Sequence, residues 1–161
     1  MRPLALLAAC VVLAPLASAA EKEKAPRQHT LSEFRLGDPI LGKGELSDAK
    51  GKGVVIEAWG VRCPPCIASL PKLQALSVRH RDKVLFFGAE SQGHDRKAIE
   101  PVIKKAGVTF PISGGLARCP VEFNAIPRAF VFDAAGKLIF DGSPHGKGFA
   151  DAVEKAAASA R

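Results

Sequence analysis

An apolar run and two closely spaced cysteines meet in residues 54–66, VVIEAWGVRCPPC. The run at 54–59 predicts a buried strand, and Cys63 and Cys66 follow it almost directly. In the first turn of a helix, cysteines three positions apart place their Cα atoms roughly 5.5 Å from each other, which a disulfide can bridge without much backbone movement. The segment therefore predicts a dithiol that opens and closes a disulfide in place.

A helix beginning at the cysteines would change the chemistry of the first one. The unpaired N–H groups and the dipole of a helix N-terminus stabilise a negative charge on sulfur. Cys63 is therefore expected to be a thiolate at a pH where an ordinary cysteine is mostly protonated. Pro64 and Pro65 suit the first helical turn, because a missing N–H costs nothing there and their fixed φ is already helical. These features predict Cys63 as the nucleophile and Cys66 as its partner in the redox disulfide.

The N-terminal residues have the pattern of an export signal. Arg2 precedes an apolar stretch from Leu4 to Leu16, and three small residues follow that stretch. This order predicts a secretory signal peptide at 1–19, which is cleaved on export and leaves the mature protein in a periplasmic or other extracytoplasmic location. The alternative is a membrane anchor, but the stretch is shorter than the roughly 20 residues of a spanning helix and is interrupted by Pro15.

The use of cysteine favours catalysis over scaffolding. Cys10 would leave with the signal peptide, or would carry a lipid anchor in an alternative that its short leader disfavours. Exported chains built on disulfide scaffolds carry more cysteines, in even number and at wide spacings. For Cys119 we favour an unreactive thiol over a regulatory or mixed disulfide, since free cysteines are commonly buried.

The chain is basic, with a formal net charge of +7 at pH 7. Its Lys and Arg residues are spread among acidic residues, without the dense basic helix or the interleaved aromatic side chains that indicate nucleic-acid binding. We therefore expect no nucleic-acid partner and a mildly basic, solvated surface. With 161 residues, 47% of them hydrophobic, the chain can build one globular domain, which we expect to be a monomer.

Hydrophobic periodicity predicts an alternation of strands and helices after a flexible polar tail at 20–30. The expected elements are an edge strand or hairpin within 31–40, strands at 54–59 and 84–89, helices at about 66–80, 95–106 and 148–159, an extended piece at 109–112, and a hairpin of 129–132 with 138–140. A parallel βαβ unit followed by an antiparallel ββα unit gives an α/β fold, a central mixed β-sheet flanked by helices on both faces.

This order of elements, with a C-x-x-C at a strand-to-helix junction and Ile126-Pro127 before a later strand, resembles the thioredoxin superfamily. It is most similar to the TlpA/ResA-like exported branch. The resemblance covers most of residues 31–161, including Pro71 in the expected helix. It implies a thioredoxin-like domain and a thiol-disulfide oxidoreductase without bound cofactor or metal. It also implies an exported cysteine-containing protein as substrate and a membrane or periplasmic redox partner.

The resemblance also implies a substrate-binding edge. The family pattern places a cis-proline opposite the dithiol, at Pro127, with Ile126 presenting its backbone to a substrate chain by strand-like pairing. Without the resemblance a trans bond would be expected, since only about 5% of X–Pro bonds in folded proteins are cis. Trp59, in the matching segment before the cysteines, is expected to contact the substrate as well.

Of two charged residues near the cysteines, Glu57 matches the family pattern and Arg62 departs from it. Glu57 lies where thioredoxins carry a buried acid, whose raised pKa would let it relay the proton of Cys66. The alternative is a solvent-facing glutamate on an alternating strand. Arg62 stands where the family usually has Trp, and its guanidinium would favour the Cys63 thiolate and make the protein a stronger oxidant. The alternative is that Arg62 points to solvent and is screened.

Two rival functions use the same region. In a periplasmic copper-binding chaperone, Cys63 and Cys66 would hold copper with a distal histidine such as His145. We rank it second, because related copper-delivery folds use C-x-x-x-C, the four histidines lack metal-ligand spacing, and Pro127 beside the thiols disfavours a metal. A thiol peroxidase lacks support, because such enzymes in this fold carry a Thr-x-x-Cys site that is absent at 62–66.

Overall fold

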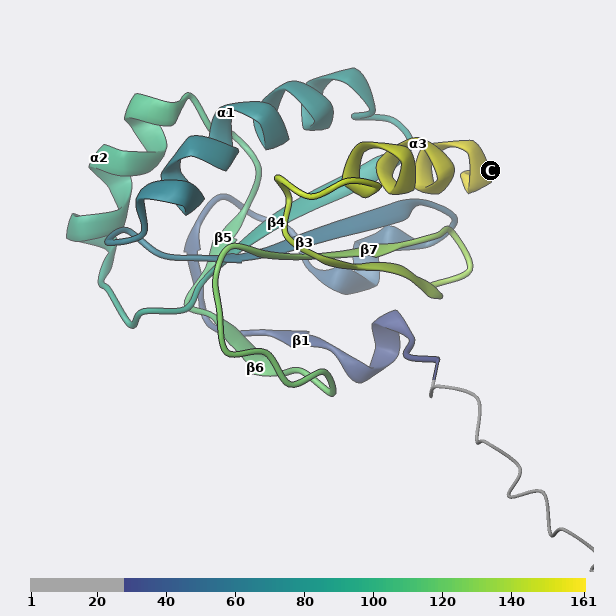
Figure 1. Cartoon of the computed structure of the whole chain (residues 1–161), viewed down its shortest axis with the longest axis horizontal. Coiled ribbons are helices and arrows are strands. Elements are labelled where there is room, and N and C mark those ends of the chain that lie inside the picture. Colours follow the sequence, from purple (N-terminus) through teal and green to yellow (C-terminus); the bar gives the residue numbers. More distant parts are fainter. Residues whose placement is uncertain (1–27) are drawn as a thin grey trace, which may run out of the picture.

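The structure is a computed structural model and describes residues 28–161. The predicted signal peptide at 1–19 with its Cys10, and the predicted tail up to residue 27, lie outside the described residues. The main sheet consists of β2 (Pro39–Leu41), β3 (Gly53–Trp59), β4 (Val84–Glu90), β5 (Ile112–Ser113), β7 (Arg128–Phe132) and β8 (Leu138–Gly142). Its strand order is β2-β5-β4-β3-β7-β8, and Figure 1 labels the four central strands β5, β4, β3 and β7.

The centre of the sheet is β3, whose seven residues are all buried. It runs parallel to β4 and antiparallel to β7, so that Glu57 lies opposite Gly88 on one side and Ala129 on the other. β5 continues the parallel part, and β2 and β8 close the two edges by antiparallel pairing. The predicted mixed sheet is confirmed, and it places the end of β3 beside the start of β7.

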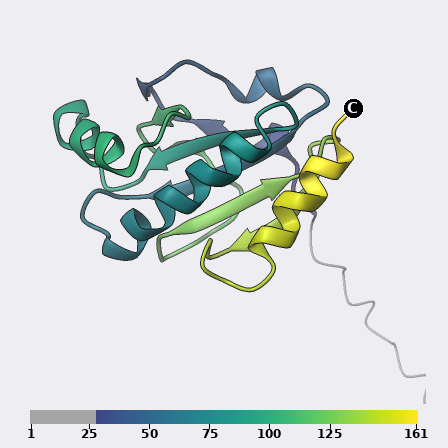
Figure 2. The same ribbon diagram turned by 90° about the horizontal axis from the view of Figure 1, so that it is seen from above.

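Three α-helices cover one face of the sheet: α1 (Pro64–Arg79), α2 (Arg96–Ala106) and α3 (Phe149–Ser159). Local signals set their ends, since the Asp95 side chain accepts a hydrogen bond from Ala98 N at 3.0 Å and Gly107 ends α2 at a φ of 68°. Figure 2 shows α1 and α3 crossing this face, with α2 beside α1. They share one core with the sheet, which includes Val55, Trp59, Leu70, Leu73, Phe86, Ile99, Ile103, Ile112, Phe149 and Val153.

The opposite face is covered by short elements and carries a second core. They are two 3-10 helices, η1 (Leu31–Glu33) and η2 (Leu46–Ala49), and a ribbon of β1 (Arg35–Leu36) with β6 (Leu116–Arg118). The core beneath them includes Phe34, Val54, Ile56, Phe87, Phe130 and Phe132. Helices were expected on both faces of the sheet. The structure has α-helices on one face and only short 3-10 helices on the other.

Residues 31–40, expected to hold an edge strand or a hairpin, contain no hairpin, and their edge strand is β2. β1 and β2 do not pair with each other, because β1 pairs with β6 and β2 pairs with β5. At Gly37 the chain passes from the β1–β6 ribbon toward the main sheet. A Cβ at this position would lie 2.2 Å from Gly114 O. Gly37 therefore lies in close contact with the backbone of Gly114, between the two strands.

None of the helices within residues 28–161 has the length and apolar character of a membrane-spanning helix.

Candidate active site

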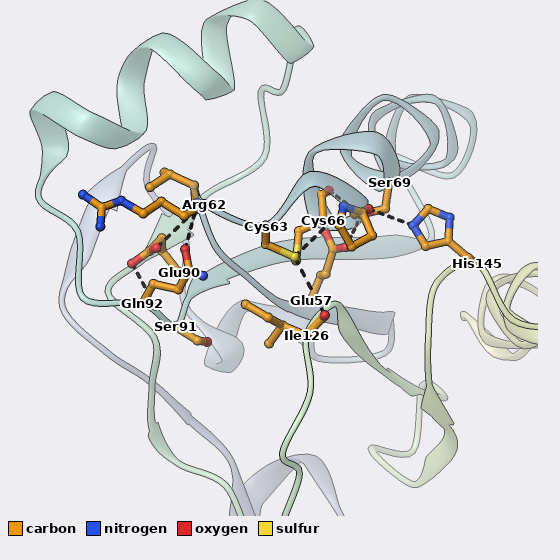
Figure 3. The surroundings of a disulfide bond; sticks show 12 residues. Glu57, Arg62, Cys63, Cys66, Ser69, Glu90, Ser91, Gln92, Ile126 and His145 are labelled. Atoms are coloured by element: carbon orange, nitrogen blue, oxygen red, sulfur yellow. Dashed lines mark hydrogen bonds between the residues drawn. A yellow bond between two sulfur atoms is a disulfide. The ribbon is translucent and has the colours of Figure 1, made fainter.

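The two cysteines lie at the junction between β3 and α1. Cys63 is the N-cap of α1 and Pro64 and Pro65 occupy its first two positions, as the missing N–H groups of proline allow. Cys63 and Cys66 are joined by a disulfide, with their Cα atoms 5.2 Å apart (Figure 3). Cys66 N donates to Cys63 Sγ at 3.3 Å. The predicted pairing at a helix N-terminus is therefore present in the structure.

The two sulfurs differ in accessibility. Cys63 is 7% exposed, whereas Cys66 is completely buried. Because a disulfide exchange requires a reagent to approach in line with the attacked or attacking sulfur, only Cys63 is open to an external partner. The burial difference assigns the outer position to Cys63 and the inner position to Cys66.

Ile126 and Pro127 lie directly opposite the disulfide. The peptide bond between them is cis, and the carbonyl oxygen of Ile126 is 3.8 Å from Cys63 Sγ. The two residues precede β7, which pairs with β3, and this pairing brings together positions 63 residues apart. Both are partly exposed, so the main chain of Ile126 is placed at the rim of the accessible sulfur.

Glu57 lies beneath the disulfide with its side chain fully buried. Its Oε1 lies 2.5 Å from Ser69 Oγ, at hydrogen-bond distance, and its Oε2 has no hydrogen-bond partner among the described residues. Burial raises the pKa of Glu57 to about 8, although a hydrogen bond that Ser69 donates to the ionised carboxylate acts in the opposite direction. The solvent-facing alternative for Glu57 is therefore wrong.

Ser69, which sequence reasoning missed, connects Glu57 to Cys66. Its Oγ is 2.6 Å from the Cys66 carbonyl oxygen and 2.5 Å from Glu57 Oε1. A hydroxyl has one hydrogen and a carbonyl can only accept, so both contacts are satisfied when Ser69 donates to Cys66 and a protonated Glu57 donates to Ser69. This arrangement agrees with the raised pKa. The available signal was a small polar residue beside Leu70 on the buried face of α1.

Trp59 is not exposed at the surface beside the disulfide. Its ring is completely buried in the core under the α-helices. It packs against the flat backbone of Gly88, where an added Cβ would lie 3.1 Å from its Nε1. The expectation of substrate contact was wrong, because the last residue of β3 points into the helical face rather than toward the exposed sulfur.

Arg62 is exposed, and its guanidinium extends away from Cys63 in Figure 3. It forms no ion pair with any residue in the range 28–161, and the residue is tied only by its main chain, whose N–H donates to Gln92 Oε1 at 2.8 Å. A charge in this position is solvated and screened. The structure therefore favours the alternative for Arg62 in which it does not tune the thiol.

The loop before Cys63 is held by a buried carboxylate that the sequence did not reveal. Glu90, at the end of β4, accepts hydrogen bonds from Val61 N at 3.4 Å and from His94 N at 2.9 Å. Its Oε1 also lies 3.0 Å from His94 Nδ1. Glu90 thereby fixes the backbone that leads into the first cysteine.

The remaining candidates are a metal site and Cys119. Among residues 28–161, no group of three or more His, Cys, Asp or Glu side chains is placed to hold a metal ion. Cys119 is half-buried with its Sγ 3.2 Å from Val121 O. Burial raises the pKa of the Cys119 thiol, which lowers its thiolate fraction and fits the expected unreactive thiol.

The sequence profile of the Redoxin family matches residues 21–156. The chain belongs to the Redoxin family. Within it, this Redoxin protein is 28% identical over 123 residues to the thiol-disulfide oxidoreductase ResA of Bacillus cereus, covering 74% of this chain and 71% of that one. ResA of Bacillus subtilis is also 28% identical over 123 residues, covering 74% and 69% of the two chains.

Solved structures confirm the thioredoxin-like fold. A DsbF homologue from Corynebacterium diphtheriae superposes with a TM-score of 0.67 at 19% identity, covering 81% of this chain and 87% of that chain. A secreted disulfide oxidoreductase from Mycobacterium tuberculosis gives a TM-score of 0.60 at 20% identity, covering 78% and 96%. The fold, the family and the cysteine pair together make this Redoxin protein a thiol-disulfide oxidoreductase, TlpA/ResA-like within the thioredoxin superfamily, which acts on cysteine-containing proteins.

Proposed function

We propose that this protein exchanges electrons with the cysteines of exported proteins through Cys63 and Cys66. The observation that supports this proposal most strongly is the asymmetry of the pair. Cys63 is 7% exposed at the N-terminus of α1, and Cys66 is buried behind it. A helix N-terminus stabilises a thiolate at the outer sulfur, and the inner sulfur is shielded from other partners.

In the reducing direction, the Cys63 thiolate attacks one sulfur of a substrate disulfide. The Cys63–substrate bond forms as the substrate S–S bond breaks, and one substrate thiolate leaves and takes up a proton. Cys66 then attacks Cys63 Sγ, which closes the protein disulfide and releases the second substrate thiol. Two electrons and two protons pass to the substrate, and the oxidising direction runs these steps backward.

Glu57 is proposed to assist the proton transfer at Cys66. Its buried carboxyl has a pKa of about 8, close to the roughly 8.5 of an ordinary thiol, so a proton can pass between the two groups at little cost. Ser69 holds the carboxyl in place through Oε1, which leaves Oε2 without a partner among the described residues. An unpartnered oxygen of this kind suits transient proton exchange.

The substrate chain is proposed to pair with the backbone at Ile126 and Pro127. A peptide laid along this rim, 3.8 Å from Cys63 Sγ at its nearest oxygen, would bring its cysteine to the outer sulfur. The exported location rests on the pattern in residues 1–19. The copper-binding chaperone stays second, because the ring Nε2 of His145 is already 2.8 Å from Pro65 O.

Trapping with a Cys66→Ala variant tests this proposal. Without the inner thiol the mixed disulfide at Cys63 cannot be resolved, so exported cysteine proteins should accumulate as adducts on the variant and be released by dithiothreitol. The double variant Cys63→Ser with Cys66→Ala is the matched control and should trap nothing. Adducts confined to proteins that are never exported, or equal adducts on the control, would contradict the proposal.

A further inference from the structure

His145 touches the active-site helix from a distant part of the chain. It lies between β8 and α3, and its Nε2 is 2.8 Å from the carbonyl oxygen of Pro65, 80 residues away. Figure 3 shows the ring reaching toward the first turn of α1 from the side opposite Arg62. A carbonyl oxygen can only accept, so the imidazole donates through Nε2–H.

The fold holds the His145 loop in place. Pro144 is buried, and its carbonyl accepts a hydrogen bond from Lys72 Nζ of α1 at 3.2 Å. The main-chain N–H of His145 donates to Ser143 Oγ at 3.2 Å, and that of Gly146 to Ser143 O at 2.9 Å. The ring therefore approaches Pro65 from a loop that is tied both to itself and to α1.

The oxygen that His145 contacts belongs to the same peptide group as the N–H that faces the nucleophile. The carbonyl of Pro65 and the N–H of Cys66 form one peptide unit, and this N–H donates to Cys63 Sγ at 3.3 Å. A hydrogen bond received at the oxygen of a peptide group polarises it and strengthens the bond given by its N–H. The effect is largest when the acceptor is charged, as a thiolate is.

We propose that His145 is a positioning residue that stabilises the Cys63 thiolate through the Pro65–Cys66 peptide group. The inference rests on the proposed role of Cys63 as nucleophile. Because thiolate stabilisation favours the reduced state, His145 makes the protein a stronger oxidant than the same fold without it. Lys72 lies on the same side and adds positive charge, but its ammonium bonds Pro144 O and not the Pro65 peptide.

The test measures the equilibrium protein disulfide + 2 glutathione ⇌ protein dithiol + glutathione disulfide at pH 7, with Cys119→Ala in every protein. Relative to the parent, His145→Ala should lower the equilibrium constant for reduction roughly threefold, from the loss of part of a charge-assisted hydrogen bond. His145→Gln keeps an N–H donor of similar reach and should retain the parent value. His80→Gln is the matched control, since His80 caps the other end of α1 and lies 3.2 Å from Glu154.

A second readout is the pH profile of Cys63 alkylation by iodoacetamide in the reduced proteins. His145→Ala should shift the profile to higher pH, and His145→Gln and His80→Gln should leave it in place. An unshifted constant and profile in His145→Ala, or equal shifts in His145→Ala and His145→Gln, would overturn the inference. Failure of the parent itself to equilibrate with glutathione would instead refute the proposed function, so the two failures are distinguishable.

Discussion

Replacing Cys63 with serine is expected to lower the rate of insulin disulfide reduction by on the order of 10³-fold or more. A serine hydroxyl is not ionised near neutral pH and cannot form the mixed disulfide through which exchange proceeds. Cys66 remains but is completely buried, so it cannot take over the attack on an external disulfide. The measurement is the initial rate of insulin reduction with dithiothreitol as the electron source.

Two further variants locate the activity. Cys66→Ser should keep the first attack but lose turnover, so that one mixed disulfide per protein accumulates when the reduced variant meets insulin in the absence of dithiothreitol. Cys119→Ser should retain the parent rate, because the half-buried thiol of Cys119 takes no part in the exchange. Retained turnover in Cys63→Ser, or its loss in Cys119→Ser, would contradict the assignment of the nucleophile.

Replacing Glu57 with glutamine is expected to make the oxidised protein progressively more stable than the parent as the pH rises. Burial raises the pKa of Glu57 to about 8 in the folded protein, from its ordinary value of 4.5. Between these values the folded state binds a proton that the unfolded state has released, so the free energy of unfolding of the parent falls with rising pH. The contribution of protonated Glu57 to the free energy of unfolding is fully present below pH 4.5 and is lost by about pH 8.

The difference between the two proteins should grow by on the order of 3–4 kcal/mol between pH 5 and pH 8. Urea unfolding at both pH values measures it, and comparing the variant with the parent cancels the other titrating groups. Glutamine keeps a donor for Ser69 Oγ, so the hydrogen bond that a protonated Glu57 provides is retained. An equal pH dependence of the two proteins would show that Glu57 is not a buried acid with a raised pKa.

The same Glu57→Gln variant distinguishes the effect of Glu57 on stability from its proposed role in proton transfer. If the carboxyl relays the proton of Cys66, resolution of the mixed disulfide should slow more than the initial attack by Cys63. Quenched-flow alkylation resolves these two steps. Equal lifetimes of the mixed disulfide in parent and variant would remove the relay role, even if the stability result holds.

The central elements of the fold could be predicted because their local signals are strong. An apolar run, two cysteines and two prolines in residues 54–66 define a strand, a cap and a first helical turn without reference to the rest of the chain. The β1–β6 ribbon could not be predicted, since strands of two and three residues carry no measurable periodicity. Their pairing depends on where Gly37 packs in the finished fold.

The candidate site likewise has a part that local sequence predicts and a part that depends on the folded chain. The spacing of Cys63 and Cys66 is local, and their pairing was predicted from it. The approach of Ile126 to Cys63 was predicted only through the resemblance, because it depends on the pairing of β3 with β7. Ser69 lies next to Leu70 on the buried face of α1, but its contact with Glu57 depends on the folded chain. The same holds for the contact of His145 with Pro65.

Equilibration with glutathione redox buffers, followed by acid quenching and mapping of the free thiols, tests the central claim most directly. We predict a single reversible two-electron transition in which Cys63 and Cys66 gain and lose their hydrogens together, while Cys119 stays reduced throughout. A pair that remains oxidised or remains reduced across the whole range of buffers would contradict the account, and so would a transition that involves Cys119.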